Sequence, residues 1–191
     1  MKLRIEYDQD CEDPSKDDSQ WKLYSFNNRH YNFKHPDNFL RPTVHGPVGV
    51  NIGFQRKLAV GTAFIVSCYQ HGSIHWGLPG EVTQCQWDTA KVAGVLVWGH
   101  PVSDMGAKTY EDRAKDARAF LEVYTDWCNG NCYGYVIEDD TGENEDSCWG
   151  FIGEEWLKDA LKDVHPELFK EGTDELKDEI EVGGEAADVM K

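Results

Sequence analysis

The chain has 191 residues, and its 35 Asp and Glu outnumber its 19 Lys and Arg, which gives a formal net charge of −16. This length suits one domain of about 100 to 200 residues, and an aromatic content of 12% is too high for a chain that is disordered throughout. A binder of nucleic acid or of an anionic membrane needs Lys and Arg to neutralise phosphates, so the composition favours a basic partner instead. No apolar run reaches the roughly 18 residues of a membrane span, which predicts a soluble, intracellular protein.

The acidic residues are concentrated in the last quarter of the chain. Residues 1–20 hold seven acids and three bases, residues 21–137 hold nine and eleven, and residues 138–188 hold nineteen and four. The net charges of these segments are −4, +2 and −15. Charge that served only solubility would be spread evenly, so this distribution indicates a localised use.

The N-terminal half has the patterns of a sheet. Leu3, Ile5 and Tyr7 alternate with polar neighbours, which predicts a half-buried strand over residues 2–7. Residues 62–69 and 94–98 are rich in β-branched and aromatic side chains and predict buried strands of an antiparallel sheet. Six aromatic residues are spaced too irregularly for one helix and are expected to fill the core: Trp21, Tyr24, Phe26, Tyr31, Phe33 and Phe39.

A long helix is expected in the middle of the chain. Thr109 is a suitable N-cap, because Asp112 follows three residues later and apolar residues then recur at helical spacing up to Cys128. Gly130 is well placed to end this helix.

A hairpin and a second helix are expected to follow. Residues 132–137 and 147–152 are apolar and aromatic, and residues 139–142 between them have turn chemistry. The second helix begins at about Glu154 and ends before Pro166. Its buried residues are expected to be Trp156, Leu157, Ala160, Leu161 and Val164.

The C-terminal segment has the pattern of a short acidic helix. Leu176 and Ile180 form an apolar stripe over residues 173–182, and the chain from Gly183 onward is expected to be a frayed tail. We therefore expect a single α+β domain with an antiparallel sheet, one long helix and an acidic helical C-terminus. Its predicted parts are a globular domain over residues 1–170 and an acidic helix and tail over residues 171–191.

The acidic helix has a charge density that invites comparison with DNA. As a helix, residues 173–182 would be about 15 Å long and would carry about one carboxylate per 3 Å, whereas duplex DNA presents about one charge per 1.7 Å. Crowding like charges destabilises a helix, which favours a use for them, although a merely solvated tail is the alternative. The candidate partner-binding residues are Asp174, Glu175, Asp178 and Glu179, followed by Glu154, Glu155, Asp159 and Asp163.

The six cysteines form no pair with the two-residue spacing of zinc ribbons or thioredoxin-like sites. Structural thiols are therefore the preferred interpretation. A metal site is the alternative, because thiolate and imidazole are ligands that zinc prefers. Its residues would be Cys68, His71, His75 and Cys85, with Asp88 nearby.

Two segments of the predicted hairpin resemble a known family. Residues 132–138 read Cys-Tyr-Gly-Tyr-Val-Ile-Glu, and residues 146–151 read Asp-Ser-Cys-Trp-Gly-Phe. The chain here resembles a family of small bacteriophage proteins that share this Tyr-Gly-Tyr and Asp-Ser-Cys-Trp-Gly-Phe hairpin. Residues 8–14, 29–39 and 85–88 are similar to the family more weakly. The resemblance implies a phage origin and assigns no catalytic residue.

These observations predict a non-enzymatic phage inhibitor that needs no cofactor and acts in the host cytoplasm. Its acidic face would mimic DNA and occupy the nucleic-acid channel of a host defence protein of the restriction or CRISPR type, an expectation that rests on charge and on analogy with other small acidic phage proteins. The first alternative is a metal-dependent phage enzyme that uses the Cys/His residues named above. The second is a virion-associated or other interaction protein that binds through Trp21, Tyr24 and Tyr31.

Overall fold

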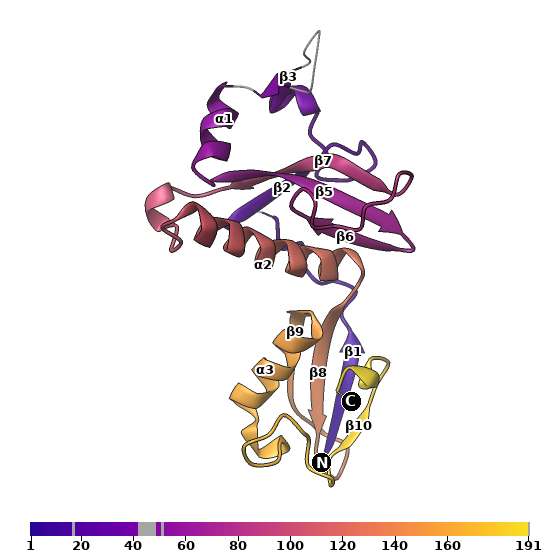
Figure 1. Ribbon diagram of the computed structural model, residues 1–191. Helices are drawn as coiled ribbons and strands as arrows, with labels where there is room; N and C mark the ends of the chain where they lie inside the picture. Colours follow the sequence, from indigo (N-terminus) through magenta and orange to yellow (C-terminus); the bar gives the residue numbers. More distant parts are fainter. Residues whose placement is uncertain (17, 42–48, 51, 191) are drawn as a thin grey trace. The chain divides into compact units, whose positions relative to one another are not determined.

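The computed structural model describes residues 1–16, 18–41, 49, 50 and 52–190. Contacts within the chain divide it into two units. Unit 1 comprises Met1–Asp13 and Asp126–Lys191, and unit 2 comprises Pro14–Thr125. The predicted α+β class with antiparallel sheets is confirmed (Figure 1).

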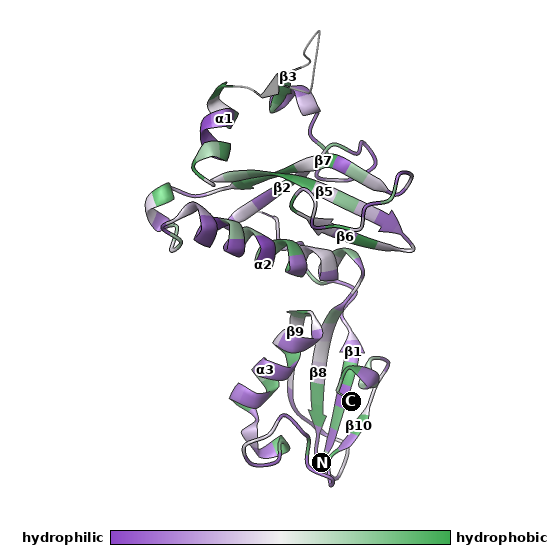
Figure 2. Cartoon of the chain, in the orientation of Figure 1, coloured by the Kyte–Doolittle hydropathy of each residue, from purple (hydrophilic) through white to green (hydrophobic). Residues whose placement is uncertain are grey.

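Unit 1 is built on a four-stranded sheet in the order β10-β1-β8-β9. Leu3 and Ile5 are fully buried, as their alternation with polar residues predicts, and green hydrophobic segments mark β1 and β8 in Figure 2. All pairs are antiparallel except the parallel pair of β10 with β1. The strands are β1 (Lys2–Tyr7), β8 (Cys132–Glu138), β9 (Asn144–Ile152) and β10 (Glu181–Gly183).

One helix, α3 (Glu154–Val164), packs against the core of this sheet. Leu157 and Leu161 are fully buried and stand one turn apart on the same side of the helix. The prediction that Trp156 and Val164 are buried is wrong, because they are 52% and 59% exposed. The helix buries a narrow stripe, and these two side chains lie outside it.

The hairpin of β8 and β9 forms as predicted, around a turn in which Gly142 has a φ of +84°. The carboxylate of Asp139 accepts hydrogen bonds from two backbone N–H groups of this turn, at 2.8 and 2.9 Å. Within the hairpin, the indole ring of Trp149 lies against Gly134, where an added Cβ would be only 2.1 Å from the ring. Glycine at this position therefore makes room for the tryptophan.

The helix predicted over residues 173–182 is absent, and the segment consists of bends and turns that lead into β10. Its backbone forms hydrogen bonds with the segment that follows α3. For example, the N–H of Lys177 donates to the carbonyl oxygen of Leu168 at 2.9 Å. Leu176 and Ile180 still pack on the core of unit 1, so the apolar residues were identified correctly but not their conformation. A short helix with like charges at i, i+4 spacing has too little free energy of formation to compete with these tertiary contacts.

The tail expected to be frayed is packed on β1. The backbone N–H of Ala186 donates to the carbonyl of Ile5 at 3.0 Å, and Ala186 and Val189 are buried. Gly184 has a φ of +98°, and an added Cβ there would lie 2.2 Å from the Ile5 carbonyl oxygen. This close approach requires glycine. The described part of residues 171–191 thus completes the core of unit 1 and ends in a 3₁₀ turn, Ala187–Met190.

Unit 2 contains a second four-stranded sheet, entirely antiparallel, in the order β2-β7-β5-β6. Trp21 and Leu23 are buried on one face of β2, where the alternation of buried and half-buried residues has a period of two. An added Cβ on Gly94 would lie 2.3 Å from the Tyr24 carbonyl oxygen, so β2 and β7 approach closely there. The strands are β2 (Trp21–Ser25), β5 (Ala63–His71), β6 (Ser73–Gly77) and β7 (Thr89–Trp98).

The predicted long helix is α2 (Tyr110–Cys128), and its capping box is present. The N–H of Asp112 donates to Thr109 Oγ1 at 3.1 Å, and the N–H of Thr109 donates to the Asp112 carboxylate at 3.3 Å. Gly130 follows with a φ of +77°, as expected for a residue that ends a helix. The shorter elements are β3 (Leu40–Arg41), β4 (Gly49–Val50), α1 (Ile52–Ala59) and 3₁₀ turns at Pro36–Asn38, Val102–Asp104 and Pro166–Leu168.

Candidate functional site

The charge of the chain divides by unit. Unit 1 contains 25 Asp and Glu and seven Lys and Arg, a net charge of −18. Unit 2 contains ten Asp and Glu and twelve Lys and Arg, a net charge of +2. The N-terminal strand and its loop therefore join the acidic C-terminal region in one strongly anionic body, which the sequence pattern alone did not reveal.

All eight acidic residues predicted to bind a partner are exposed on unit 1. Four of them line one groove of about 800 Å³ between α3 and the segment before β10, namely Glu155, Asp159, Asp174 and Glu175. The other four do not line this groove, namely Glu154, Asp163, Asp178 and Glu179. The structure thus brings half of the predicted set together.

Lysines interrupt this acidic surface. Lys162 forms an ion pair with Asp174, and Lys170 lies 3.4 Å from a Glu175 carboxylate oxygen and 2.9 Å from one of Asp178. The hydrogen bond to Asp178 raises the pKa of Lys170. Because these carboxylates are largely exposed, each pair contributes little free energy and can be exchanged for another partner.

The acids of α3 are less neutralised. Within the described chain, Glu154, Glu155, Asp159 and Asp163 form no ion pair. Glu155, Asp159 and Asp163 are spaced four residues apart, so they lie along one side of the helix. Among the described residues this row is therefore free of ion pairs, whereas three of the four C-terminal acids that the sequence ranked first are paired with lysines.

A histidine is held between two carboxylates at the end of α3. His165 Nε2 lies 2.7 Å from Asp146, and its Nδ1 lies 3.0 Å from Glu167. Burial alone would lower the pKa of His165, but the hydrogen bonds to the two carboxylates outweigh it and raise the pKa. The Tyr135 hydroxyl also donates to Asp146 at 2.9 Å, so this cluster ties α3 to both strands of the hairpin.

The residues of the alternative metal site come together only in part. The Cys85 thiol donates to Asp88 at 3.3 Å, and His71 Nδ1 lies 3.2 Å from the same carboxylate oxygen. Cys68 lies elsewhere on β5, where burial raises its pKa to about 11, so it is a thiol and not a thiolate at neutral pH. Across the residues that the structure describes, no group of three His, Cys, Asp or Glu is arranged to hold a metal ion.

The aromatic residues of the other alternative differ in exposure. Tyr31 is 60% exposed, but Trp21 is only 2% exposed and its indole N–H donates to Asp116 at 2.9 Å. Trp21 therefore belongs to the core, and the prediction that it is available to a partner is wrong. The most exposed tryptophan is Trp87, at 86%.

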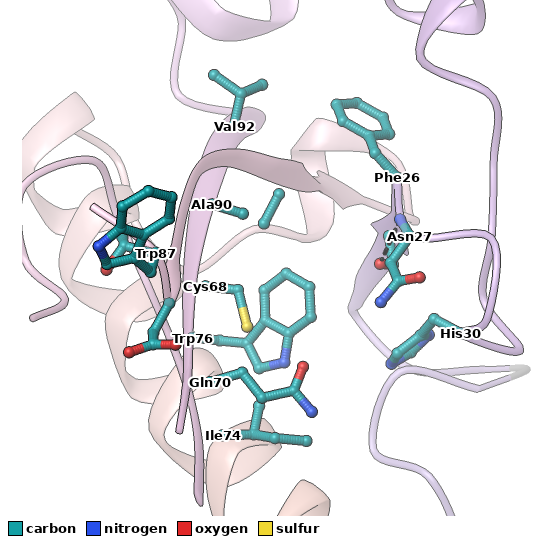
Figure 3. Close-up of a pocket in the computed structure, with 14 residues that line it drawn as sticks. Phe26, Asn27, His30, Cys68, Gln70, Ile74, Trp76, Trp87, Ala90 and Val92 are labelled. Carbon is teal, nitrogen blue, oxygen red and sulfur yellow. Dashed lines mark hydrogen bonds between the residues drawn. The ribbon is translucent and has the colours of Figure 1, made fainter. Parts of the chain in front are cut away.

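A cavity of about 490 Å³ lies in unit 2, where β5, β6 and β7 meet the loop that follows β2. In Figure 3 the ring of Trp76 is drawn among the lining residues, with Phe26, Asn27 and His30 on one side and Trp87 on the other. The remaining lining residues are Ser25, Cys68, Gln70, Ile74, Asp88, Thr89, Ala90, Val92 and Ala93.

Trp76 has an unsatisfied polar group in the wall of this cavity. Its backbone N–H donates to Thr125 Oγ1 at 3.0 Å, and its side chain is only 5% exposed. The indole Nε1 is buried and donates to no described residue. A buried donor without an acceptor costs about 1–3 kcal/mol.

The hydrogen bonds of His30 fix its ring in the opposite wall. Its Nδ1 accepts the backbone N–H of Asn32 at 3.2 Å, so that nitrogen carries no proton. The proton on Nε2 is then donated to the Tyr124 hydroxyl, at 3.2 Å. Sequence reasoning missed this cavity, because its residues come from separate segments with no common spacing.

Comparison with known proteins adds no assignment. Neither the family models, nor the curated proteins, nor the solved structures contain a match to this chain. In the described parts of the chain, no helix combines the length and the apolar character needed to cross a membrane.

Proposed function

We propose that this protein is a non-enzymatic inhibitor whose acidic unit occupies the nucleic-acid-binding cleft of a host defence protein in the host cytoplasm. The observation that supports the proposal is the segregation of charge, with −18 on unit 1 against +2 on unit 2. The resemblance of the hairpin to bacteriophage proteins favours a nuclease of the restriction or CRISPR type as the partner.

The physical basis is competition for cations. A nucleic-acid-binding cleft is lined with Lys and Arg side chains that bind phosphate groups. An anionic protein surface attracts the same side chains. Long-range attraction would make association fast and strongly dependent on salt. The row of Glu155, Asp159 and Asp163 on α3 is the part of unit 1 that we place in the cleft first.

The paired carboxylates have a second role in the proposal. The exposed carboxylates of Asp174, Glu175 and Asp178 are paired with the half-buried Lys162 and Lys170 in the free protein. Arginines of the partner can replace these lysines, because an exposed pair is worth only about 0–1 kcal/mol. The C-terminal acids then extend the contact that the α3 row begins.

The test compares two charge reversals of equal size. Glu155→Lys with Asp159→Lys alters the α3 row, whereas Glu111→Lys with Glu122→Lys alters exposed acids of α2 in unit 2. Host proteins captured on each variant at about 50 and 200 mM salt are assayed for displacement from duplex DNA.

We expect the α3 reversal to abolish capture and DNA displacement at the lower salt concentration, and the α2 reversal to retain both. Equal capture by both variants would contradict the proposal, as would a captured protein that still binds DNA. Thermal unfolding of the variants checks that each remains folded.

A further inference from the structure

We propose that the cavity in unit 2 is a binding site for an uncharged planar heteroaromatic ring of the nucleobase class, taken as the base or the nucleoside. This site is separate from the acidic surface, and its existence does not depend on the proposed inhibitor function.

The size and walls of the cavity fit a flat ring. Its volume of about 490 Å³ lies in the range of about 300–1,000 Å³ that is typical of small-molecule sites. Trp76 and Phe26 supply aromatic surface inside it, and Trp87 presents a nearly bare indole at 86% exposure. Nucleobases stack on such side chains because every base has a π-face.

The polar groups fit the edge of a base. Asn27 and Gln70 line the cavity and are exposed, and each primary amide offers a donor beside an acceptor. Paired donors and acceptors are what Asn and Gln use to recognise base edges in nucleic acids.

The unsatisfied indole N–H of Trp76 is an independent indication of a ligand. It is a donor in the cavity wall that lacks an acceptor among the described residues. A ring nitrogen or carbonyl oxygen of a base would supply one. Because Nε1 is shielded from solvent, the bound ring reaches it by displacing the side chains that cover it.

The charges around the cavity select against ions. Its lining contains no Lys or Arg, so it offers no group to bind a phosphate. Its one carboxylate, on Asp88, already accepts a hydrogen bond from the Cys85 thiol and lies 3.2 Å from His71 Nδ1, which leaves it a weaker anchor for a cationic ligand than a free carboxylate. An uncharged ring remains as the ligand that the walls accommodate.

The experiment measures binding of adenosine, guanosine, cytidine and uridine to the full chain, with adenosine monophosphate and choline as charged probes. Saturation-transfer NMR detects the bound ligand, and tryptophan fluorescence gives the affinity. Trp87→Ala removes the exposed stacking surface, and Trp76→Phe removes the N–H but keeps an aromatic ring. Trp156→Ala is the matched control, since Trp156 is 52% exposed on unit 1.

We expect at least one nucleoside to bind, and Trp87→Ala to weaken it by about 5- to 100-fold. Trp76→Phe should weaken binding without lowering the melting temperature, because it also removes an unsatisfied donor. Trp156→Ala should leave the affinity unchanged, and adenosine monophosphate should bind no more tightly than adenosine. The proposal is overturned if no nucleoside binds, if choline binds more tightly than every nucleoside, or if Trp87→Ala and Trp156→Ala behave alike.

Discussion

Replacement of Gly134 by alanine should displace the ring of Trp149 and destabilise unit 1. The new Cβ would lie 2.1, 2.4 and 2.8 Å from three carbons of the indole, so the ring has to move. Trp149 is 48% exposed, and about half of its surface is therefore covered. A tryptophan side chain of about 250 Å² would then lose up to roughly 125 Å² of contact, worth about 3 kcal/mol at about 25 cal/mol per Å². Partial relaxation reduces the expected loss to about 1–3 kcal/mol.

A double-mutant cycle measures this coupling. The free energy of unfolding is obtained by urea titration for the parent chain, Gly134→Ala, Trp149→Ala and the double variant. In the Trp149→Ala background, Gly134→Ala should cost little or stabilise, because alanine in a strand loses less entropy than glycine by about 0.5–1 kcal/mol. An equal cost of Gly134→Ala in both backgrounds would refute the reasoning, since the clash with the indole would then not be its cause.

Three further predictions concern the cap of α2, the histidine cluster and the tail. Thr109→Ala should lower the stability of unit 2 by about 1 kcal/mol through loss of the N-cap, read from chemical denaturation, and an unchanged midpoint would contradict it. The raised pKa of His165 means that its protonated form stabilises the fold fully below its ordinary value of 6.5, and that this contribution is lost as pH rises through the folded-state pKa. Over that pH range, the free energy of unfolding of the parent should therefore fall relative to that of His165→Gln by about 0.5–1 kcal/mol. The expected change is modest because Asp146 is 43% exposed. Parallel pH profiles of stability for the two proteins would count against the pairing. Gly184→Ala should increase amide hydrogen exchange in β1 and β10, because the Cβ of the alanine would lie only 2.2 Å from the Ile5 carbonyl oxygen. Unchanged protection of these amides would show that the tail does not pack on β1.

Local signals predicted the elements that are stabilised locally. The long helix was recognisable because Thr109 and Asp112 cap it through contacts three residues apart, and the hairpin because its turn chemistry lies between two apolar runs. The strand β2 was not recognised, although Trp21 and Leu23 alternate with polar neighbours as residues of a strand do. The nearby aromatic residues obscured this period of two.

Contacts between distant segments could not be predicted in the same way. Leu176 and Ile180 are spaced for a helix, but the conformation of their segment depends on hydrogen bonds to residues around Leu168. The candidate sites were unpredictable for the same reason, because each is formed by residues from separate segments. The acidic groove joins α3 to a later segment, and the unit 2 cavity joins residues from Ser25 to Ala93, so neither has a signature within one stretch of sequence.

The discontinuity of unit 1 has a consequence for synthesis. Its strand β1 is made before unit 2, but its partners β8 and β10 follow only after the whole of unit 2. At about 5–20 residues per second, the 112 residues of unit 2 take about 6 to 22 seconds to be made, and β1 lacks its neighbours throughout that time. A chain that stalls within β9 would carry a complete unit 2 and an incomplete anionic unit 1, so the two proposed sites would form in a fixed order.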